Sequence, residues 1–543
     1  MMRKQTLLQL FASVGAAALA ACGSPGASPG PIEESVDTAQ QALDVVSICS
    51  QDPRVNLNLV PLSVCAGARL FFDETFGGNG RTCGSCHPAA NNFTVDAPFI
   101  AGLHASQPQN PLFVFENPAF PLGGLEDPFI FSQNALIKEN LDDDFQDPLR
   151  FVGRAVNHTF SLATTITRDP NDNTSADVVE RTGWGGDGAP GTGTLREFID
   201  GAIKQHYPKR LQRQTDVDFR FSTNTEKDQL VAFQTALGRT ADINFDNVTL
   251  TDVGAAAGRV AYMDPFQGRC NECHLNGGGN AKLSGKNRNF DTGVTEAPTS
   301  FSQISIGTMF DGGFGGKNSP VFTHTTVTGQ PDAFGDGSFS TPSVIEAADT
   351  GPFFHTHAFG TIGGATPDPD TQIEQAVIFY ATTLFGNSPA AIQMNNNFGH
   401  RAIDIVSGSQ IEDIGRFLRV LNVAFNVQLA FQRLNASHTL NVAFWGFRDD
   451  IQKGLISLAK EEADDAFRVL ASTITVPANS GPLHPDQQTQ ISTAISLMDQ
   501  ALAATDPAVR RDRTTDALNL LTTVNSALGT GMNFQLGAGN LMF

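Results

Sequence analysis

The chain has 543 residues, a length that corresponds to several domains. Hydrophobic residues make up 40% and charged residues 17%, as expected for a globular protein with extended cores. The formal net charge of −21 disfavours nucleic acid or an anionic lipid surface as a partner, because both would repel the chain. The same charge would attract a basic redox protein, although it also serves solubility alone.

The N-terminus is predicted to be a targeting segment. Arg3 and Lys4 precede an apolar run at residues 7–19 that is too short to span a bilayer. The run ends in LAAC at Cys22, which resembles a bacterial lipobox. The resemblance implies a signal peptide at residues 1–21 and a lipid on Cys22. It implies an exported protein that is anchored to a bacterial membrane, on its periplasmic or cell-surface side, by the lipid only. An ordinary signal peptide with a chance cysteine is the alternative.

The rest of the chain divides by composition. Residues 22–45 are rich in Ser, Pro, Gly and Ala, which predicts a flexible tether. Residues 46–245 and 246–423 are predicted to be two domains of short helices and long loops. Residues 424–543 have long amphipathic patterns and no chemical motif, which predicts a C-terminal helical bundle. The fold is therefore predicted to be mainly α.

The motif C-x-x-C-H occurs twice, as CGSCH at residues 83–87 and CNECH at residues 270–274. Two thiols followed by an imidazole at this spacing are the pattern for covalent haem attachment, with the histidine ligating the iron. A zinc site would usually need a second cysteine pair nearby, and the two copies are widely separated. The sequence therefore predicts two haem c groups. Their attachment residues are Cys83, Cys86, Cys270 and Cys273, and their iron ligands are His87 and His274.

Two of the seven cysteines remain when four are assigned to haem and one to lipid. They are Cys49 and Cys65, which precede the first motif. Disulfides persist in exported proteins. We predict that these two residues form a disulfide; two free buried thiols are the alternative.

Segments near both motifs resemble the bacterial di-haem cytochrome c peroxidase family, which includes MauG-type enzymes. They are LFFD at 70–73, NFDTG at 289–293, and the stretch from FSTPS at 339–343 to TGPFFH at 350–355. The similarity spans residues 60–425 and is patchy, but the last stretch is specific. It implies two cytochrome c-like haem domains and reduction of hydrogen peroxide. The electrons would come from a small redox donor such as a cytochrome c or cupredoxin.

The resemblance assigns further roles. A helical run ending at Tyr380 puts this residue where the family has the sixth ligand of the second haem; a packed core tyrosine is the alternative. Trp184 matches a tryptophan that relays electrons between the haems, with a structural aromatic as the alternative. Thr350 and Pro352 match carbonyl ligands of a calcium ion, with Asn157 as a third ligand. Calcium is therefore a further candidate cofactor.

The chain departs from the peroxidases at the first haem. The peroxidases carry a catalytic glutamate about twenty residues after the tryptophan, and no acid occurs there in this chain. Glu197 and Asp200 lie nearer the tryptophan, and Phe198 stands in the pocket position instead. This pattern resembles the di-haem rubber oxygenases, which bind dioxygen. His104 and His206 are two further candidates for the first haem pocket, with surface or structural roles as alternatives.

Three functions remain open. The first is a peroxidase; the second is rubber-oxygenase-like or MauG-like oxidation of an organic or protein substrate; the third is a non-enzymatic electron-transfer lipoprotein. The composition has 41 Phe against 3 Tyr and 2 Trp. This bias suits oxidising chemistry because phenylalanine resists oxidation, although lineage composition would also explain it.

Overall fold

The computed structural model describes residues 45–140, 145, 151–172, 178–185, 193–296, 310–313, 322–325, 331–359, 369–398, 408–444, 448–471 and 482–543. The predicted signal peptide, Cys22 and almost all of the predicted tether lie outside these residues. The part of the chain from Val45 onward forms one unit. Within the described ranges, no helix is long and apolar enough to cross a membrane.

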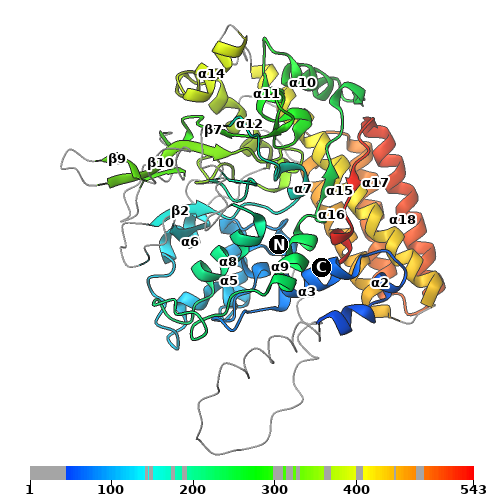
Figure 1. Cartoon of the computed structure of the whole chain (residues 1–543). Coiled ribbons are helices and arrows are strands. Elements are labelled where there is room, and N and C mark those ends of the chain that lie inside the picture. Colours follow the sequence, from blue (N-terminus) through cyan, green and yellow to red (C-terminus); the bar gives the residue numbers. More distant parts are fainter. Residues whose placement is uncertain are drawn as a thin grey trace, which may run out of the picture. The chain divides into compact units, whose positions relative to one another are not determined.

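The structure is mainly helical, as predicted (Figure 1). We refer to residues 46–245 as the first motif region. Two of its strands, β1 (Leu136–Asn140) and β2 (Phe151–Ala155), pair antiparallel with Leu136 opposite Ala155. Its α-helices are α2 (Pro53–Asn56), α3 (Leu62–Asp73), α4 (Cys83–Cys86), α5 (Ala97–Ser106), α6 (Pro128–Asn134), α7 (Leu162–Thr165), α8 (Leu195–His206) and α9 (Asn224–Gln234).

Local side-chain chemistry fixes where helix α8 begins and which face it buries. The Thr194 hydroxyl accepts from the Glu197 backbone N–H, and the Glu197 carboxylate accepts from the Thr194 backbone N–H. This reciprocal cap satisfies two backbone donors that have no partner within the helix. Leu195, Ile199 and Ile203 then follow at helical spacing and are buried.

Residues 246–423 form the second motif region, which has more strand. Strand β10 (Pro331–Ser340) is central: it pairs antiparallel with β7 (Asn289–Phe290) and β9 (Phe322–Thr325), and parallel with β8 (Phe310–Gly313). A small antiparallel pair, β5 (Asn280–Ala281) and β6 (Lys286–Asn287), follows the second motif. The helices of this region are α10 (Val253–Met263), α11 (Cys270–Cys273), α12 (Pro369–Tyr380), α13 (Thr383–Gly386), α14 (Pro389–Phe398) and the start of α15 (Gly408–Phe444).

The two motif regions repeat one arrangement of helices. In each region a helix leads to the C-x-x-C helix, and a later helix crosses the first one at a glycine. Helix α3 crosses α9 at Gly67, where an added Cβ would lie 1.9 Å from the Gln229 carbonyl oxygen. Helix α10 crosses α15 at Gly258, where it would lie 1.8 Å from the Asp413 carbonyl oxygen. Any side chain at either glycine would force the two backbones apart.

The C-terminal bundle consists of α15, α16 (Asp449–Ala471), α17 (Pro485–Ala503) and α18 (Pro507–Leu528). Figure 1 shows α16, α17 and α18 side by side along one edge of the molecule. Pro507 begins α18 and Gly529 follows its end, which is the usual placement of these residue types at helix ends. The predicted boundary at residue 424 falls inside α15, where Val423 and Ala424 are both buried. The second motif region and the bundle therefore share a continuous helix rather than a linker.

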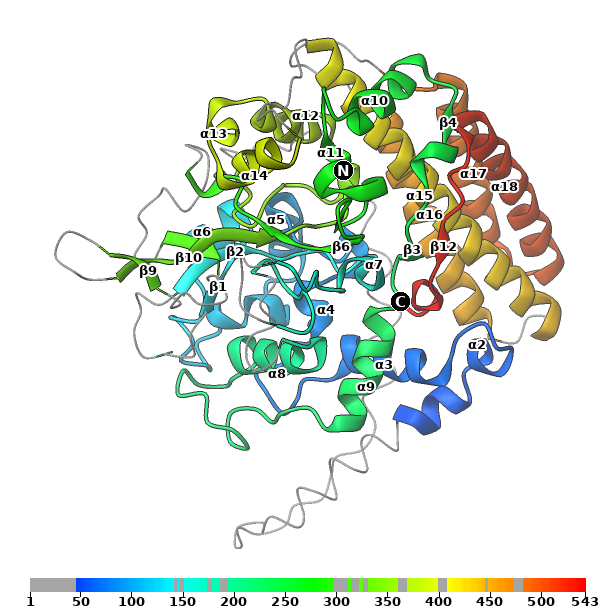
Figure 2. The same cartoon turned by 45° about the horizontal axis from the view of Figure 1, so that its top comes forward.

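After α18 the chain returns along the segment that connects the two motif regions. Strand β11 (Gly529–Thr530) pairs with β4 (Thr249–Leu250), and β12 (Gln535–Leu536) pairs with β3 (Arg239–Ala241). Figure 2 shows β12 beside β3, with the end of the chain nearby. We call residues 529–543 the tail. Its backbone pairing joins the end of the bundle to the connection between the motif regions.

Candidate functional site

The first motif holds a neutral, oriented imidazole. His87 follows helix α4, and its Nδ1 lies 2.9 Å from the Phe93 carbonyl oxygen. Burial lowers the pKa of His87, so the ring is neutral near pH 7. With Nδ1–H donating to a carbonyl, Nε2 keeps its lone pair for a metal ion. The residue thus has the form that an iron ligand needs.

The two thiols of the first motif lie between two apolar cores. Cys83 packs beside the core that contains Phe71 and Ile203, and Cys86 packs beside the core that contains Phe113. The Tyr207 hydroxyl donates to the Cys83 sulfur at 3.2 Å. Burial raises the pKa of each thiol to about 11. Both thiols are therefore protonated near pH 7 and partly covered by apolar side chains.

Buried charged groups surround the first motif. Arg81 and Glu126 form an ion pair at 3.1 Å, and both are almost completely buried. The Nδ1 of His206 lies 3.9 Å from Glu126. Burial, followed by the positive charges of Arg81 and Arg213, lowers the pKa of His206 to about 3. The Glu126 carboxyl is also close enough to Cys86 to raise the pKa of that thiol.

Glu126 was missed by the sequence reasoning. It lies far from the first motif along the chain, and no spacing pattern connects the two. The fold brings them together because Arg81, two residues before the motif, takes Glu126 as its partner. The only sequence signal was the short acidic segment Glu126-Asp127 before helix α6, which reads equally well as a helix cap.

The second motif holds its imidazole in the same way. The Nδ1 of His274 lies 3.0 Å from the Pro342 carbonyl oxygen, and burial lowers the pKa of His274 to about 4. The Tyr262 hydroxyl donates to the His274 carbonyl oxygen at 2.7 Å. Burial raises the pKa of Cys270 and of Cys273 to about 12. Both motifs therefore present two half-buried thiols and a neutral imidazole held at Nδ1.

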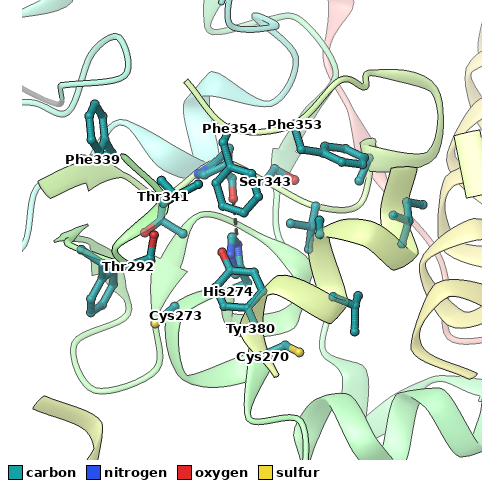
Figure 3. Close-up of a pocket in the computed structure, with 18 of the residues that line it drawn as sticks. Cys270, Cys273, His274, Thr292, Phe339, Thr341, Ser343, Phe353, Phe354 and Tyr380 are labelled. Carbon is teal, nitrogen blue, oxygen red and sulfur yellow. Dashed lines mark hydrogen bonds between the residues drawn. The ribbon is translucent and has the colours of Figure 1, made fainter. Parts of the chain in front are cut away.

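The second motif opens into a cavity with mostly apolar walls (Figure 3). Phe339, Phe353 and Phe354 line it together with Tyr380, which lies at the end of α12. Burial raises the pKa of Tyr380, so its phenol stays protonated unless a metal ion displaces the proton. An aromatic cavity bounded by two thiols, an imidazole and a phenol fits a covalently attached haem.

Trp184 lies at the contact between the two motif regions. It lines the cavity of the second motif, and its ring centroid is 6.4 Å from that of His355. Its Nε1–H donates to the Ala155 carbonyl oxygen at 3.0 Å, and its ring packs on Ile130 and Leu136 of the first motif region. Trp184 therefore contacts both regions, as a relay residue would need to.

The remaining residues predicted for the first pocket do not all lie near the first motif. Phe198 on α8 packs against Gly183, next to Trp184. A Cβ on that glycine would lie 3.0 Å from the Phe198 ring. Glu197 belongs to the cap of α8, and Asp200 accepts from Ser222 and pairs with Lys227. His104 is exposed, and its Nε2 lies 2.9 Å from Glu116. Of the two candidate histidines, only His206 lies among buried groups beside the first motif.

The predicted calcium ligands belong to the residues that line one cavity. Asn157, Thr350 and Pro352 all line the cavity of the second motif. The Thr350 hydroxyl donates to the Glu346 carbonyl oxygen. Within the described ranges, no cluster of three or more His, Cys, Asp or Glu side chains could hold a metal ion. A cation at this wall would therefore depend on carbonyl and amide oxygens.

Cys49 and Cys65 form a disulfide, with a Cα–Cα distance of 5.8 Å. Both residues are fully buried. The bond attaches the start of the described chain to α3, the helix that leads to the first motif.

Searches against models of protein families, curated proteins and solved structures give no significant match.

Proposed function

We propose that this protein is a di-haem c-type oxidoreductase of the cytochrome c peroxidase type. The observation that carries the proposal is the duplicated device at the two motifs. In each, two thiols adjoin a neutral imidazole whose Nδ1 is held by a carbonyl, from Phe93 in one case and Pro342 in the other. Two copies of this device favour two haems, each with one histidine ligand.

The chain's own residues would divide the work between the sites. When bound, haem iron supplies one-electron redox chemistry and a place for peroxide to react. His87 and His274 would hold the two irons. Tyr380, at the cavity of the second motif, would be a second ligand there; its phenolate would favour ferric iron. Trp184, in contact with both regions, would carry electrons between the sites.

The acid for a peroxidase would be Glu126 rather than a residue on α8. Reduction of hydrogen peroxide to two waters consumes two protons and two electrons, so a buried carboxyl beside the first site is a useful proton store. Burial raises the pKa of Glu126, and Arg81 opposes that shift. His206 is its neighbour at 3.9 Å. Because these groups could supply protons at the first site, they favour the peroxidase reaction over the other two functions.

The second candidate is oxidation of an organic or protein substrate, with dioxygen or peroxide as the oxidant. It is favoured by the resemblance to the rubber oxygenases, which gives the first pocket an apolar residue, Phe198, and no acid at the peroxidase position. It is also favoured by Tyr380, whose phenolate would suit an oxidised iron. A non-enzymatic electron carrier is the third candidate. In all three cases we propose an exported protein anchored by lipid at Cys22, with a small redox protein as partner.

Turnover measurements on the full-length protein, matured in a host that attaches haem c, separate these functions. We expect peroxide consumption that depends on a reduced cytochrome c or cupredoxin. Oxygen uptake with polyisoprene, without peroxide consumption, would support the second candidate instead. Two low-spin haems that react with neither oxidant in any redox state would leave only the carrier.

A further inference from the structure

The end of the tail packs against the residue that orients the first histidine. The ring of Phe543 meets the ring of Phe93 edge-on, with centroids 4.8 Å apart, and lies 6.2 Å from the ring of Phe72. The carbonyl of Phe93 accepts the hydrogen bond from His87. Phe543, which is distant from the first motif along the chain, thus contacts the residue whose carbonyl orients His87.

Phe93 needs such support because of its backbone conformation. Its φ is +58°, which is unfavourable for a bulky residue and requires surrounding contacts to maintain it. Its ring is fully buried among the rings of Phe71, Phe160 and Phe543. If one of these rings were removed, Phe93 could relax, and its carbonyl would turn relative to His87.

The bundle holds Phe543 in place through Arg433 of α15. The guanidinium lies 4.8 Å from the centroid of the Phe543 ring, a cation–π distance. Its Nε donates to the Asn540 carbonyl oxygen at 3.0 Å, and one terminal nitrogen pairs with Glu462 of α16 at 2.6 Å. The Asn540 side chain also exchanges two hydrogen bonds with the backbone of Gly238. The tail is therefore attached to α15 and to the connection between the motif regions.

We infer that Phe543 is a positioning residue for the first haem: through Phe93 it fixes the carbonyl that orients His87. The bundle carries the tail back to the first motif. The inference requires His87 to be a haem ligand and otherwise goes beyond the proposed reaction.

The carbonyl that orients His274 is held by other contacts. It belongs to Pro342, in a segment held by the second motif region and the connecting segment. The Asn287 side chain donates to the Thr341 carbonyl oxygen at 2.9 Å, and Arg239 donates to the Ser343 hydroxyl at 2.8 Å. Substitutions of Phe543 should therefore change the EPR signal and midpoint potential of the first haem alone.

The test uses the full-length protein with both haems attached, and the variants Phe543→Leu and Phe543→Ala. The readouts are the EPR spectrum of each ferric haem and the midpoint potential of each haem. We expect the first haem to show a shifted or split EPR signal and a shifted potential, more so for alanine, while the second haem is unchanged. Phe534→Ala is the matched control, because Phe534 is a buried tail residue whose ring packs on Phe425 instead.

The inference is overturned if both Phe543 variants leave the first haem's signals unchanged, or if Phe534→Ala shifts them equally. Should the alanine variant lose the first haem altogether, the leucine variant still reports on the geometry. Haem content and peroxide turnover of the unaltered protein are measured separately. Absence of turnover with both haems bound would reject the proposed reaction while leaving the positioning role testable by EPR.

Discussion

The two motif sites share a ligand-holding device and differ in what surrounds it. At the first, the Arg81–Glu126 pair and His206 lie beside the thiols. At the second, an apolar cavity contains a phenol, Tyr380, and reaches Trp184. The motif alone therefore predicts which group is attached, whereas the surroundings determine its role. Buried titratable groups suit proton-consuming chemistry at the first site, and a phenol ligand suits electron handling at the second.

Removing the thiols of one motif at a time should have the largest effect. Cys83→Ala with Cys86→Ala should lose the first haem and all peroxide turnover. Cys270→Ala with Cys273→Ala should lose the second haem and leave turnover without an electron supply. Haem content and donor-dependent activity measure both outcomes. A double variant that still carries two covalent haems would show that its motif is not an attachment site.

Glu126→Gln tests the proton-transfer role of the first site. The amide can still accept from Arg81, so the fold should survive, but it cannot give or take a proton. We expect peroxide turnover to fall about 100-fold, the lower end of the effect of losing a general acid or base. Glu116→Gln is the control, because Glu116 is an exposed acid paired with His104. Equal turnover in the two variants would remove Glu126 from the mechanism.

The bundle should make stability depend on pH near neutrality. Burial raises the pKa of Glu462 to about 7, above the value of an exposed glutamate. The folded state therefore binds a proton more tightly than the unfolded state. Its stabilising contribution is complete below about pH 4.5 and is lost as the pH rises through about 7, a change of roughly 1–3 kcal/mol. Denaturant unfolding at several pH values between 5 and 8, in the wild type and in a variant without this carboxyl, measures the contribution of Glu462 to the free energy of unfolding.

In Glu462→Gln the contribution of Glu462 to that pH dependence should disappear. Because Glu462 holds Arg433 and Arg433 contacts the tail, spectral changes with pH should also be confined to the first haem. The buried histidines, whose lowered pKa values make stability rise over the same range, are common to both proteins. A difference in stability between wild type and variant that does not fall between pH 5 and 7 would therefore contradict this assignment.

Tyr380→Phe should change the second haem with little loss of stability. The ring contacts with Phe354 and Phe385 remain, and only the hydroxyl is removed. We expect a changed absorption and EPR spectrum for the second haem alone. Tyr262→Phe is the comparison, since it loses the hydrogen bond to the His274 carbonyl, worth about 1 kcal/mol, without removing a ligand. Identical spectra in the Tyr380 variant and the wild type would make Tyr380 a packing residue.

The sequence predicted the features that depend on neighbours along the chain. Helical periodicity predicted the mainly α fold and the helices of the C-terminal bundle. Spacing alone identified both motifs. The boundary predicted at residue 424 falls inside α15, whose apolar pattern continues through that position without a helix breaker.

The surroundings of the sites could not be predicted in the same way. Glu126, Tyr262 and Phe543 reach the motifs through tertiary contacts, and nothing in their own sequence neighbourhoods distinguishes them from an ordinary cap, core or terminal residue. Such contacts depend on how distant helices pack together. Local sequence patterns do not reveal them.

The central claim is that the chain carries two covalent haems in unequal sites. Intact-protein mass spectrometry combined with EPR of the fully ferric protein tests it most directly. We predict a mass increase of two haem groups and two distinct ferric signals, of which only one changes in Tyr380→Phe. A chain with fewer than two attached haems, or one signal that accounts for both irons, would contradict it.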